Sequence, residues 1–153
     1  MNPDFSDLLA EFNAHGVEFL VVGAHALAAH GVVRATKDLD VWVNPTPANA
    51  TRVLRAIAAF GAPLHDLTAS DLATPGIVFQ IGVPPIRIDI VTAIDGVGFA
   101  QAWSARLMTR FAGCETAVLS RRDLIASKKA AGRLQDLADV QRLEALPPAA
   151  GGR

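Results

Sequence analysis

The sequence predicts a small α/β domain, with a mostly mixed sheet of four or five strands and helices on its faces. Its 153 residues suffice for one domain with a sizeable hydrophobic core. Short β-branched runs alternate with segments whose apolar residues recur at helical spacing, and glycine or proline separates most of them. Hydrophobic residues make up 51% of the chain and charged residues 19%, a balance that excludes a disordered protein.

The first 60 residues are predicted to alternate helices and strands. Apolar residues recur at helical spacing after Asp4, and the run VEFLVV favours a central strand. Gly23 ends that strand before an alanine-rich helix, Asn44-Pro45 ends the next strand, and Thr46-Pro47 is typical of a helix start. The predicted elements are a helix over 4–14, a strand over 17–22, a helix over 24–30, a strand over 38–43 and a helix over 46–60.

The remaining chain is predicted to contain a hairpin followed by helices around one more strand. The link Gly82-Val83-Pro84-Pro85 favours a tight turn, and Ser120 and Asp123 stand in capping-box positions. The predicted elements are strands over 76–82 and 85–92, a helix over 99–103, a strand over 116–119 and helices over 120–132 and 134–146. Residues 1–146 therefore form one predicted domain, and the tail PPAAGGR, 147–153, is predicted to be disordered.

Charge and cysteine content limit the partners and the compartment. The formal net charge of −1 gives no global field that attracts nucleic acid, so any polyanion must be held by a local patch. The single cysteine, Cys114, permits no internal disulfide, and the N-terminus has no basic region followed by an apolar run. No apolar segment reaches the ~18 residues that span a bilayer. A soluble cytoplasmic protein without a membrane partner is expected.

The stretch RATKDLDVWV places two carboxylates at the head of an apolar strand. Residues i and i+2 of a strand share a face, so Asp38 and Asp40 point together while Leu39 faces the core. Their like charges repel unless a cation compensates them, and Mg²⁺ prefers oxygen ligands. The alternative is an exposed strand end whose aspartates pair with Arg34 or Lys37.

A third carboxylate lies in the later stretch IRIDIVT. Ile88 and Ile90 occupy one face of this predicted strand, and Asp89 lies on the other. A neighbouring strand can thus add a carboxylate at a position where an uncompensated charge is costly. The alternative is a salt bridge between Asp89 and Arg87, which share that face.

Small residues mark the turn in VVGAHALAAHG, where a strand leads into a helix. Such residues let backbone N–H groups approach a phosphate, and the start of a helix favours negative charge. The alternative is a tight packing turn between strand and helix.

Together these stretches resemble the core pattern of the nucleotidyltransferase superfamily. Gly23-Ala24 matches its glycine turn, Asp38 and Asp40 its acidic pair, and Asp89 its distal acid. The chain further resembles the small bacterial branch described as abortive-infection-toxin-like or minimal nucleotidyltransferases, over residues 17–146. Ala24 departs from the usual second glycine or serine, so a hydroxyl contact to phosphate is lost while the backbone N–H is kept. The segments that carry the likeness are GAHALAAHG, RATKDLDVWV, PPIRIDIVT and LSRRDLIASKKAAGRLQDLADVQRL.

Basic residues near the C-terminus supply a candidate phosphate contact. Lys128 lies on the stripe of its predicted helix that also holds Leu124, so it either extends to solvent or reaches into a cleft. In the resemblance, Lys128 is the residue expected to meet the triphosphate. The following pattern of alternating charge is predicted to be a solvated, ion-paired helix face, in which Asp136 could orient a basic group. The residues of this pattern are Arg133, Asp136, Asp139 and Arg142.

The histidines and the cysteine are not expected to bind metal. No His or Cys partner stands at metal-ligand spacing from His25 or His30. His25 lies in the small-residue turn and is included among the predicted nucleotide-binding residues. Cys114 has no paired nucleophile context.

The resemblance implies nucleotidyl transfer from an NTP, for example ATP, to an acceptor hydroxyl, with release of pyrophosphate. Asp38 and Asp40 would hold two Mg²⁺ ions, and Asp89 would complete one site and help to deprotonate the acceptor. Two metals about 3.5–4 Å apart stabilise both the attacking and the leaving oxygen. The predicted nucleotide-binding residues are Gly23, Ala24, His25, Arg34 and Lys128.

Two questions stay open from the sequence. Arg34 either contacts phosphate or acceptor, or balances Asp38, and the acceptor is RNA, protein or a small molecule. The alternative function is a non-catalytic nucleotide-binding or partner-binding module, such as one half of a toxin–antitoxin pair. The presence of all three carboxylates favours the enzyme.

Overall fold

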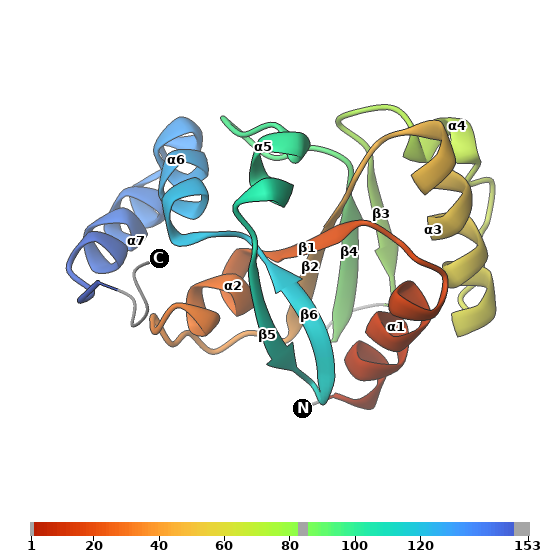
Figure 1. The fold of residues 1–153 in the computed structure, drawn as a ribbon, viewed down its shortest axis with the longest axis horizontal. Coiled ribbons are helices and arrows are strands. Elements are labelled where there is room, and N and C mark those ends of the chain that lie inside the picture. The colour runs from red at the N-terminus through yellow and green to blue at the C-terminus, as the bar shows by residue number, and fades with distance from the viewer. Residues whose placement is uncertain (1, 83–85, 149–153) are drawn as a thin grey trace.

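The computed structural model of the chain describes residues 2–82 and 86–148. Its six strands form one mixed sheet in the order β3-β4-β2-β1-β6-β5 (Figure 1). The strands are β1 (Phe19–Val22), β2 (Asp38–Val43), β3 (Val78–Ile81), β4 (Arg87–Val91), β5 (Leu107–Phe111) and β6 (Cys114–Val118). The helices are α1 (Pro3–Ala14), α2 (Gly23–Ala29), α3 (Pro47–Phe60), α4 (Ala69–Leu72), α5 (Phe99–Ser104), α6 (Arg121–Ala131) and α7 (Leu134–Glu144).

The sheet mixes parallel and antiparallel pairs. Strand β1 runs antiparallel to β2 and parallel to β6, while β2 runs parallel to β4. Antiparallel hairpins, β3–β4 and β5–β6, close the two edges. The predicted α/β class and mixed sheet are confirmed, and so is the predicted pairing of the two strands around residue 84. The link 83–85 itself lies outside the described residues.

The sheet has six strands instead of the predicted four or five, because β5 was not recognised in the sequence. This edge strand alternates between partly buried and exposed side chains, with Met108 50% exposed, so it lacks the buried apolar run that predicts a strand. The turn after it places both Ala112 and Gly113 at positive φ. An alanine in that conformation is uncommon, and Ala-Gly is therefore a weak hairpin signal. The short helix α4 was missed for a similar reason, since it has only four residues.

Helices cover the two faces of the sheet differently. On one face, Phe12 of α1 contacts Phe19 of β1, with ring centroids 5.3 Å apart. On the other face, Phe99 of α5 contacts Trp42 of β2 at 5.0 Å. Asp40 shares the face of Trp42 because the two are alternate residues of one strand. Helix α5 therefore covers one end of this face and leaves the aspartate end uncovered.

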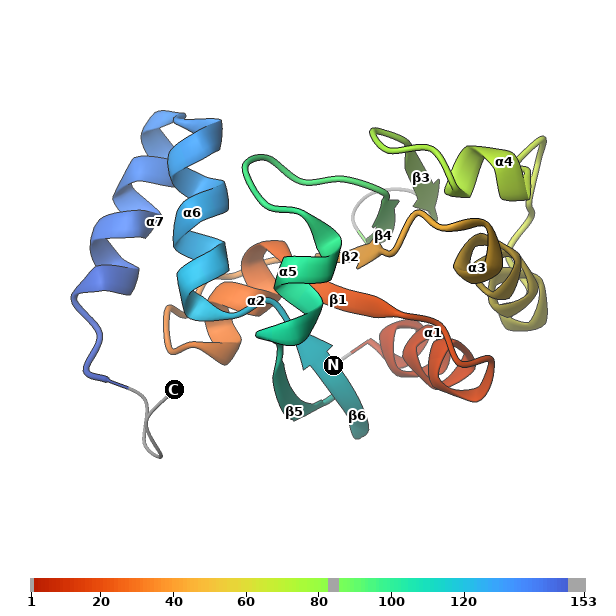
Figure 2. The same ribbon diagram turned by 45° about the horizontal axis from the view of Figure 1, so that its top comes forward.

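Helices α6 and α7 pack side by side at the opposite end of the molecule from α1 and α3 (Figures 1 and 2). Ser120 caps α6 by accepting a hydrogen bond from the Asp123 backbone N at 3.1 Å. The Asp123 side chain accepts instead from Gln101, so only half of the predicted capping box forms. Gly132 ends α6 in the left-handed conformation.

Two further predictions concern the tail and membranes. Of the predicted disordered tail, only Pro147 and Pro148 are described, and the Pro147 carbonyl accepts a hydrogen bond from Arg121 at 2.9 Å. Residues 149–153 lie outside the described part of the chain. Among the described residues, no helix has the length and apolar character required to cross a bilayer.

Candidate active site

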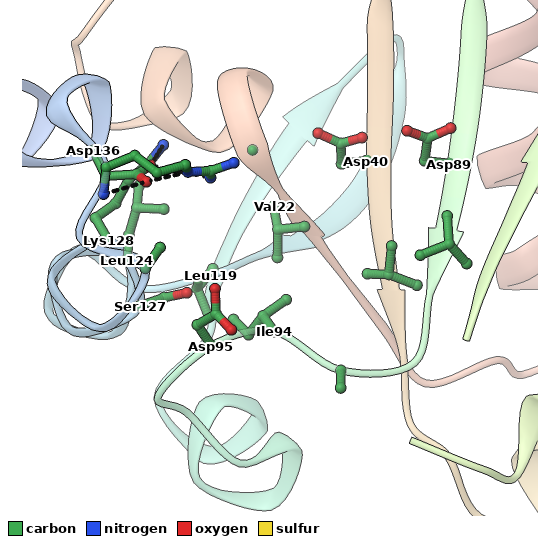
Figure 3. A pocket seen from close by; sticks show the side chains of 16 residues that line it. Val22, Asp40, Asp89, Ile94, Asp95, Leu119, Leu124, Ser127, Lys128 and Asp136 are labelled. Atoms are coloured by element: carbon green, nitrogen blue, oxygen red, sulfur yellow. Dashed lines mark hydrogen bonds and ion pairs between the residues drawn. The ribbon is translucent and has the colours of Figure 1, made fainter. Parts of the chain in front are cut away.

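Parallel pairing of β2 with β4 brings the three predicted acidic residues together. Asp40 stands directly opposite Asp89, and Asp38 stands opposite Arg87. Paired residues of neighbouring strands share a face, so all three carboxylates lie on the face of Trp42, at the end that α5 leaves uncovered. Figure 3 shows Asp40 and Asp89 side by side on their strands. The predicted convergence of Asp38, Asp40 and Asp89 on one face of the sheet is thus what the fold produces.

Arg87 is the basic partner inside this cluster. Its Nε lies 2.9 Å from Asp89 Oδ1, and its Nη2 lies 3.2 Å from Asp89 Oδ2. The same Nη2 donates to Asp38 Oδ2 at 3.3 Å. The predicted salt bridge between Arg87 and Asp89 therefore exists. In the described part of the chain, the ion-pair partner of Asp38 is Arg87, and the alternative pairing with Arg34 or Lys37 was wrong.

Asp40 is the aspartate of the cluster that Arg87 does not bind directly. Burial raises the pKa of its carboxyl, and the negative charges of Asp89 and Asp38 raise it further, to about 6. The charge of Arg87 offsets only part of this effect. The cluster therefore carries more negative charge than its own cation compensates.

Gly23 fits closely against Asp40 at the start of α2. Its φ of +71° is a left-handed conformation, and a Cβ built there would overlap Asp40 Oδ2. Glycine is thus required twice, once for the backbone and once for the approach of the carboxylate. Ala24 follows within the first turn of α2, whose N-cap residue Val22 supplies no side-chain hydrogen bond. The first backbone N–H groups of this helix are available to a ligand.

A cavity of about 330 Å³ extends from the carboxylates to helices α6 and α7. Asp40 and Asp89 line one end, and Lys128, Arg133 and Asp136 line the other (Figure 3). Asp38 and its ion-pair partner Arg87 are not among the lining residues. The side chains between the two ends are largely apolar. They include Val22, Ile94, Leu119 and Leu124.

Lys128 is held at its end of the cavity by two buried carboxylates. Its Nζ lies 3.3 Å from Asp136 Oδ1 and 3.0 Å from Asp139 Oδ2. Arg133 Nε also binds Asp136, at 2.6 Å, and hydrogen bonds from Arg133 and Lys128 lower the Asp136 pKa. The predicted role of Asp136 in orienting a basic group is therefore confirmed.

The charged face of α7 was predicted to be solvated and ion-paired; ion pairs form and Arg133 and Arg142 are exposed, but the prediction was wrong for the two aspartates. Asp136 is 3% exposed and Asp139 is fully buried. Burial alone would raise the Asp139 pKa, but hydrogen bonds from Arg34, Lys128 and Gln135 lower it to about 2. The alternating charges along α7 do not reveal that Asp139 also binds a third cation, which lies 105 residues away in the sequence.

That third cation is Arg34, which the structure places away from the cavity. Both terminal nitrogens of Arg34 donate to Asp139, one of them at 3.0 Å. Arg34 does not line the cavity and does not balance Asp38, so both interpretations of this residue are corrected. Its partner is the same buried carboxylate that holds Lys128.

His25 is likewise not brought to the cavity. Its ring packs edge-on between Phe5 and Phe111, with centroid distances of 5.6 and 5.1 Å. Burial lowers its pKa, and its Nε2 has no hydrogen-bond partner among the described residues. His25 therefore serves packing, which corrects its inclusion among the nucleotide-binding residues.

Two polar residues that the sequence did not single out also line the cavity. Asp95 follows β4, and Ser127 lies on α6 one turn after Leu124 (Figure 3). The loop of Asp95 lies close to α6, since a Cβ on Gly96 would meet the Ala130 side chain at 2.6 Å. The Asp-Gly pair after a buried strand was the available signal for a functional turn.

The donor set of the cluster fits a hard divalent cation. Carboxylate oxygens on one face, with uncompensated negative charge, are what Mg²⁺ prefers. As placed, no three acidic, histidine or cysteine side chains among the described residues are arranged to hold a metal. In this structure Arg87 binds oxygens of both Asp38 and Asp89.

Comparisons with known proteins show the family of the chain and solved structures that share its fold. The model of the family described as nucleotidyl transferase of unknown function (DUF2204) matches residues 2–150. None of the curated proteins matches the chain. Among solved structures, the lincosamide antibiotic adenylyltransferase LnuA with lincomycin bound is 11% identical, with a TM-score of 0.60, covering 96% of this chain and 98% of its own. The ANT(2")-Ia complex with adenylyl-2"-tobramycin is 14% identical, with a TM-score of 0.56, covering 91% of this chain and 84% of its own. At these identities the two structures share the fold with this chain.

Proposed function

The chain belongs to this nucleotidyl transferase family (DUF2204), and from that premise we propose that it moves the nucleoside monophosphate of an NTP to an acceptor hydroxyl. The acceptor oxygen bonds to the α-phosphorus, the bond from that phosphorus to the bridging oxygen breaks, and pyrophosphate leaves. The proton of the acceptor hydroxyl passes to a carboxylate of the site. Membership of this family does not by itself identify the substrates of the reaction.

One observation carries the proposal: a single cavity joins the carboxylate pair Asp40 and Asp89 to Lys128. An NTP needs both ends at once, because its phosphates are anionic and its reacting phosphorus must lie beside the carboxylates. The two ends are held by different parts of the fold, the sheet and α6. This arrangement supports nucleotide binding in one orientation, with the leaving phosphates toward Lys128.

The carboxylates have distinct proposed roles. Asp38, Asp40 and Asp89 would hold Mg²⁺, two ions in our proposal, which when bound neutralise charge on the attacking and leaving oxygens. Asp89 lies directly opposite Asp40 and is proposed to help take the proton of the acceptor hydroxyl. Gly23 allows Asp40 to lie against the start of α2, so that the carboxylate and the backbone N–H of Ala24 face one ligand.

Lys128 is proposed to bind the β- and γ-phosphates. An ammonium group has three N–H donors, and the contacts to Asp136 and Asp139 engage two of them. The third donor remains for a phosphate in the cavity that Lys128 lines. The two buried carboxylates fix the position of Lys128 before the nucleotide binds, which reduces the entropy lost on binding.

A labelling experiment can identify whether the acceptor is RNA, protein or a small molecule. LnuA and ANT(2")-Ia were solved with an antibiotic or an adenylylated antibiotic, which supports testing small molecules beside RNA and protein. We propose incubation of the protein with each labelled NTP, Mg²⁺ and cell extract, followed by separation of these three fractions. Label should appear in one fraction with wild type and not with Asp40→Asn.

Absence of label from all fractions with all four NTPs would contradict the proposal. It would favour the non-catalytic alternative, a nucleotide-binding or partner-binding module such as a toxin–antitoxin component. Binding of an NTP without transfer would point to the first form, and co-purification with a defined protein partner to the second.

A further inference from the structure

Arg87 occupies a particular place among the three carboxylates. It stands opposite Asp38 in the register and two residues before Asp89 on the same strand, so its side chain must lie on the carboxylate face. Its Nη2 contacts Asp38 at 3.3 Å and Asp89 at 3.2 Å, and its Nε lies 2.9 Å from Asp89. One guanidinium thus bridges carboxylates from two strands.

These contacts use the oxygens that a divalent cation would need. Asp89 accepts a hydrogen bond from Arg87 through Oδ2 and lies at ion-pair distance from it through Oδ1, and Asp38 accepts through one oxygen. While the contacts last, these oxygens of Asp38 and Asp89 are occupied by the guanidinium. Accordingly, the described residues contain no ready group of three metal ligands, although three carboxylates share the face.

The surroundings of Arg87 allow it to leave. Its side chain is 28% exposed, whereas the Lys128 side chain at the other end of the cavity is 16% exposed. Asp38 is 41% exposed, so the Arg87–Asp38 contact lies at the surface, where ion pairs are weak. The contact with Asp89 is more buried, since Asp89 is 13% exposed, and it is the contact that the cation must displace. Release of the guanidinium into solvent would leave the apolar core intact.

We propose that Arg87 is a displaceable counter-ion: it holds Asp38 and Asp89 in the metal-free protein and competes with the divalent cation for them. This rests on the proposed metal-binding role of the carboxylates. Arg87 is a positioning residue, because it acts through the orientation of Asp38 and Asp89. Metal affinity is reduced by the free energy needed to release the guanidinium.

Calorimetric titration of Mg²⁺ alone into nucleotide-free protein tests the competition. Arg87→Gln removes the competing charge, and binding should tighten at least about tenfold, since a charge at this spacing near a protein surface is worth more than that factor. Arg87→Lys keeps the charge without the planar fork, so its affinity should lie between those of wild type and Arg87→Gln. Arg55→Gln, an exposed arginine on α3, controls for net charge and should stay within about twofold of wild type.

A double variant tests whether any gain in Mg²⁺ affinity depends on the carboxylates. In Arg87→Gln combined with Asp89→Asn, the gain in Mg²⁺ affinity should be lost, because Asp89 is one of the two carboxylates that Arg87 holds. Melting of the metal-free proteins gives an independent readout: Arg87→Gln should melt below wild type, and added Mg²⁺ should raise its melting temperature more. An Arg87→Gln protein that does not fold leaves Arg87→Lys to carry the same comparison.

The outcomes separate this inference from the proposed function. Equal or weaker Mg²⁺ binding by both Arg87 variants would overturn the competition while leaving the metal site in place. Absence of Mg²⁺ binding from wild type and variants alike would overturn both the competition and the metal-binding role. Tighter binding by Arg87→Gln that persists without Asp89 would place the metal elsewhere, which also overturns the inference.

Discussion

The charged clusters at the two ends of the cavity, each including residues that do not line it, contain aspartates and cations in opposite proportion. At the sheet end, Asp38, Asp40 and Asp89 share one cation among the described residues, Arg87. At the helical end, two buried aspartates have three cations as partners. These are Asp136 and Asp139 with Arg34, Lys128 and Arg133.

The pKa shifts of Asp40 and Asp139 follow the ratio of cations to carboxylates at each end, and not burial alone. The Asp40 pKa is raised to about 6, whereas the more buried Asp139 has its pKa lowered to about 2. Hydrogen-bonded cations thus reverse the effect that burial has on a carboxyl group. The sheet end is left with negative charge for a cation to neutralise, and the helical end is already neutralised and can position Lys128.

The largest expected effect comes from removing a carboxylate at the helical end. Asp139→Asn should lower the free energy of unfolding by about 3–5 kcal/mol, because Arg34 and Lys128 lose a fully buried partner. Urea unfolding measures it. The matched control is Glu144→Gln, which breaks an exposed ion pair with Lys129 between the same two helices and should cost about 0–1 kcal/mol. Equal losses in the two variants would show that the buried cluster does not hold the helices as described.

A smaller effect is expected at the contact between the glycine turn and the sheet end. Gly23→Ala should destabilise by about 1–3 kcal/mol from left-handed strain and should also displace Asp40, whose oxygen the new Cβ would overlap. Gly16→Ala is the control, since Gly16 has a similar φ of +67° but no atom near its added Cβ. Both should lose stability, and only Gly23→Ala should lose nucleotide transfer. Loss of transfer in neither variant would contradict the close fit of Gly23 and Asp40.

The opposite pKa shifts predict opposite dependence of stability on pH. Because Asp40 has a folded pKa of about 6 against 3.8 unfolded, the folded protein binds more protons between pH 4 and 6, and stability falls as pH rises through that window. The loss should be about 1–2 kcal/mol, less than the full shift implies because Asp40 is partly exposed. Asp139 behaves inversely: its contribution is present above pH 4 and is lost as pH falls toward 2.

Subtracting the unfolding free energies of Asp40→Asn from those of wild type at each pH isolates the Asp40 contribution. The subtraction removes the effect of His25, whose lowered pKa makes stability rise with pH near its own titration. Added Mg²⁺ should abolish the change in this wild-type-minus-variant difference as the pH rises from 4 to 6. A difference that is flat with pH would show that Asp40 is not short of a counter-charge.

The sequence predicted the sheet end of the cavity well and the helical end poorly. Asp38, Asp40 and Asp89 were predicted because strand alternation is a local rule, and the parallel register of β2 and β4 then places them together. Lys128 was recognised as a cleft residue, but its partner Asp139 was assigned to a solvated face. The contact of Arg34 with Asp139 joins residues 105 positions apart, and no local pattern encodes it.

Other errors have the same physical origin. His25 lies in the predicted phosphate turn by sequence, yet its ring turns toward Phe5 and Phe111, which come from distant segments. Strand β5 was missed because an edge strand needs few buried residues. Features set by alternation, capping and glycine were predictable, whereas features set by pairing between distant segments were not.

The central claim is that the sheet end holds negative charge in order to bind a cation. Asp40→Asn tests it directly, because the change keeps the shape of the side chain and removes its charge. With metal removed by chelation, the variant should be more stable than wild type at pH 7 by about 1 kcal/mol, since repulsion from Asp38 and Asp89 is relieved. Transfer of label from NTP should fall by about a hundredfold or more. A variant that is less stable than wild type and fully active would contradict the claim.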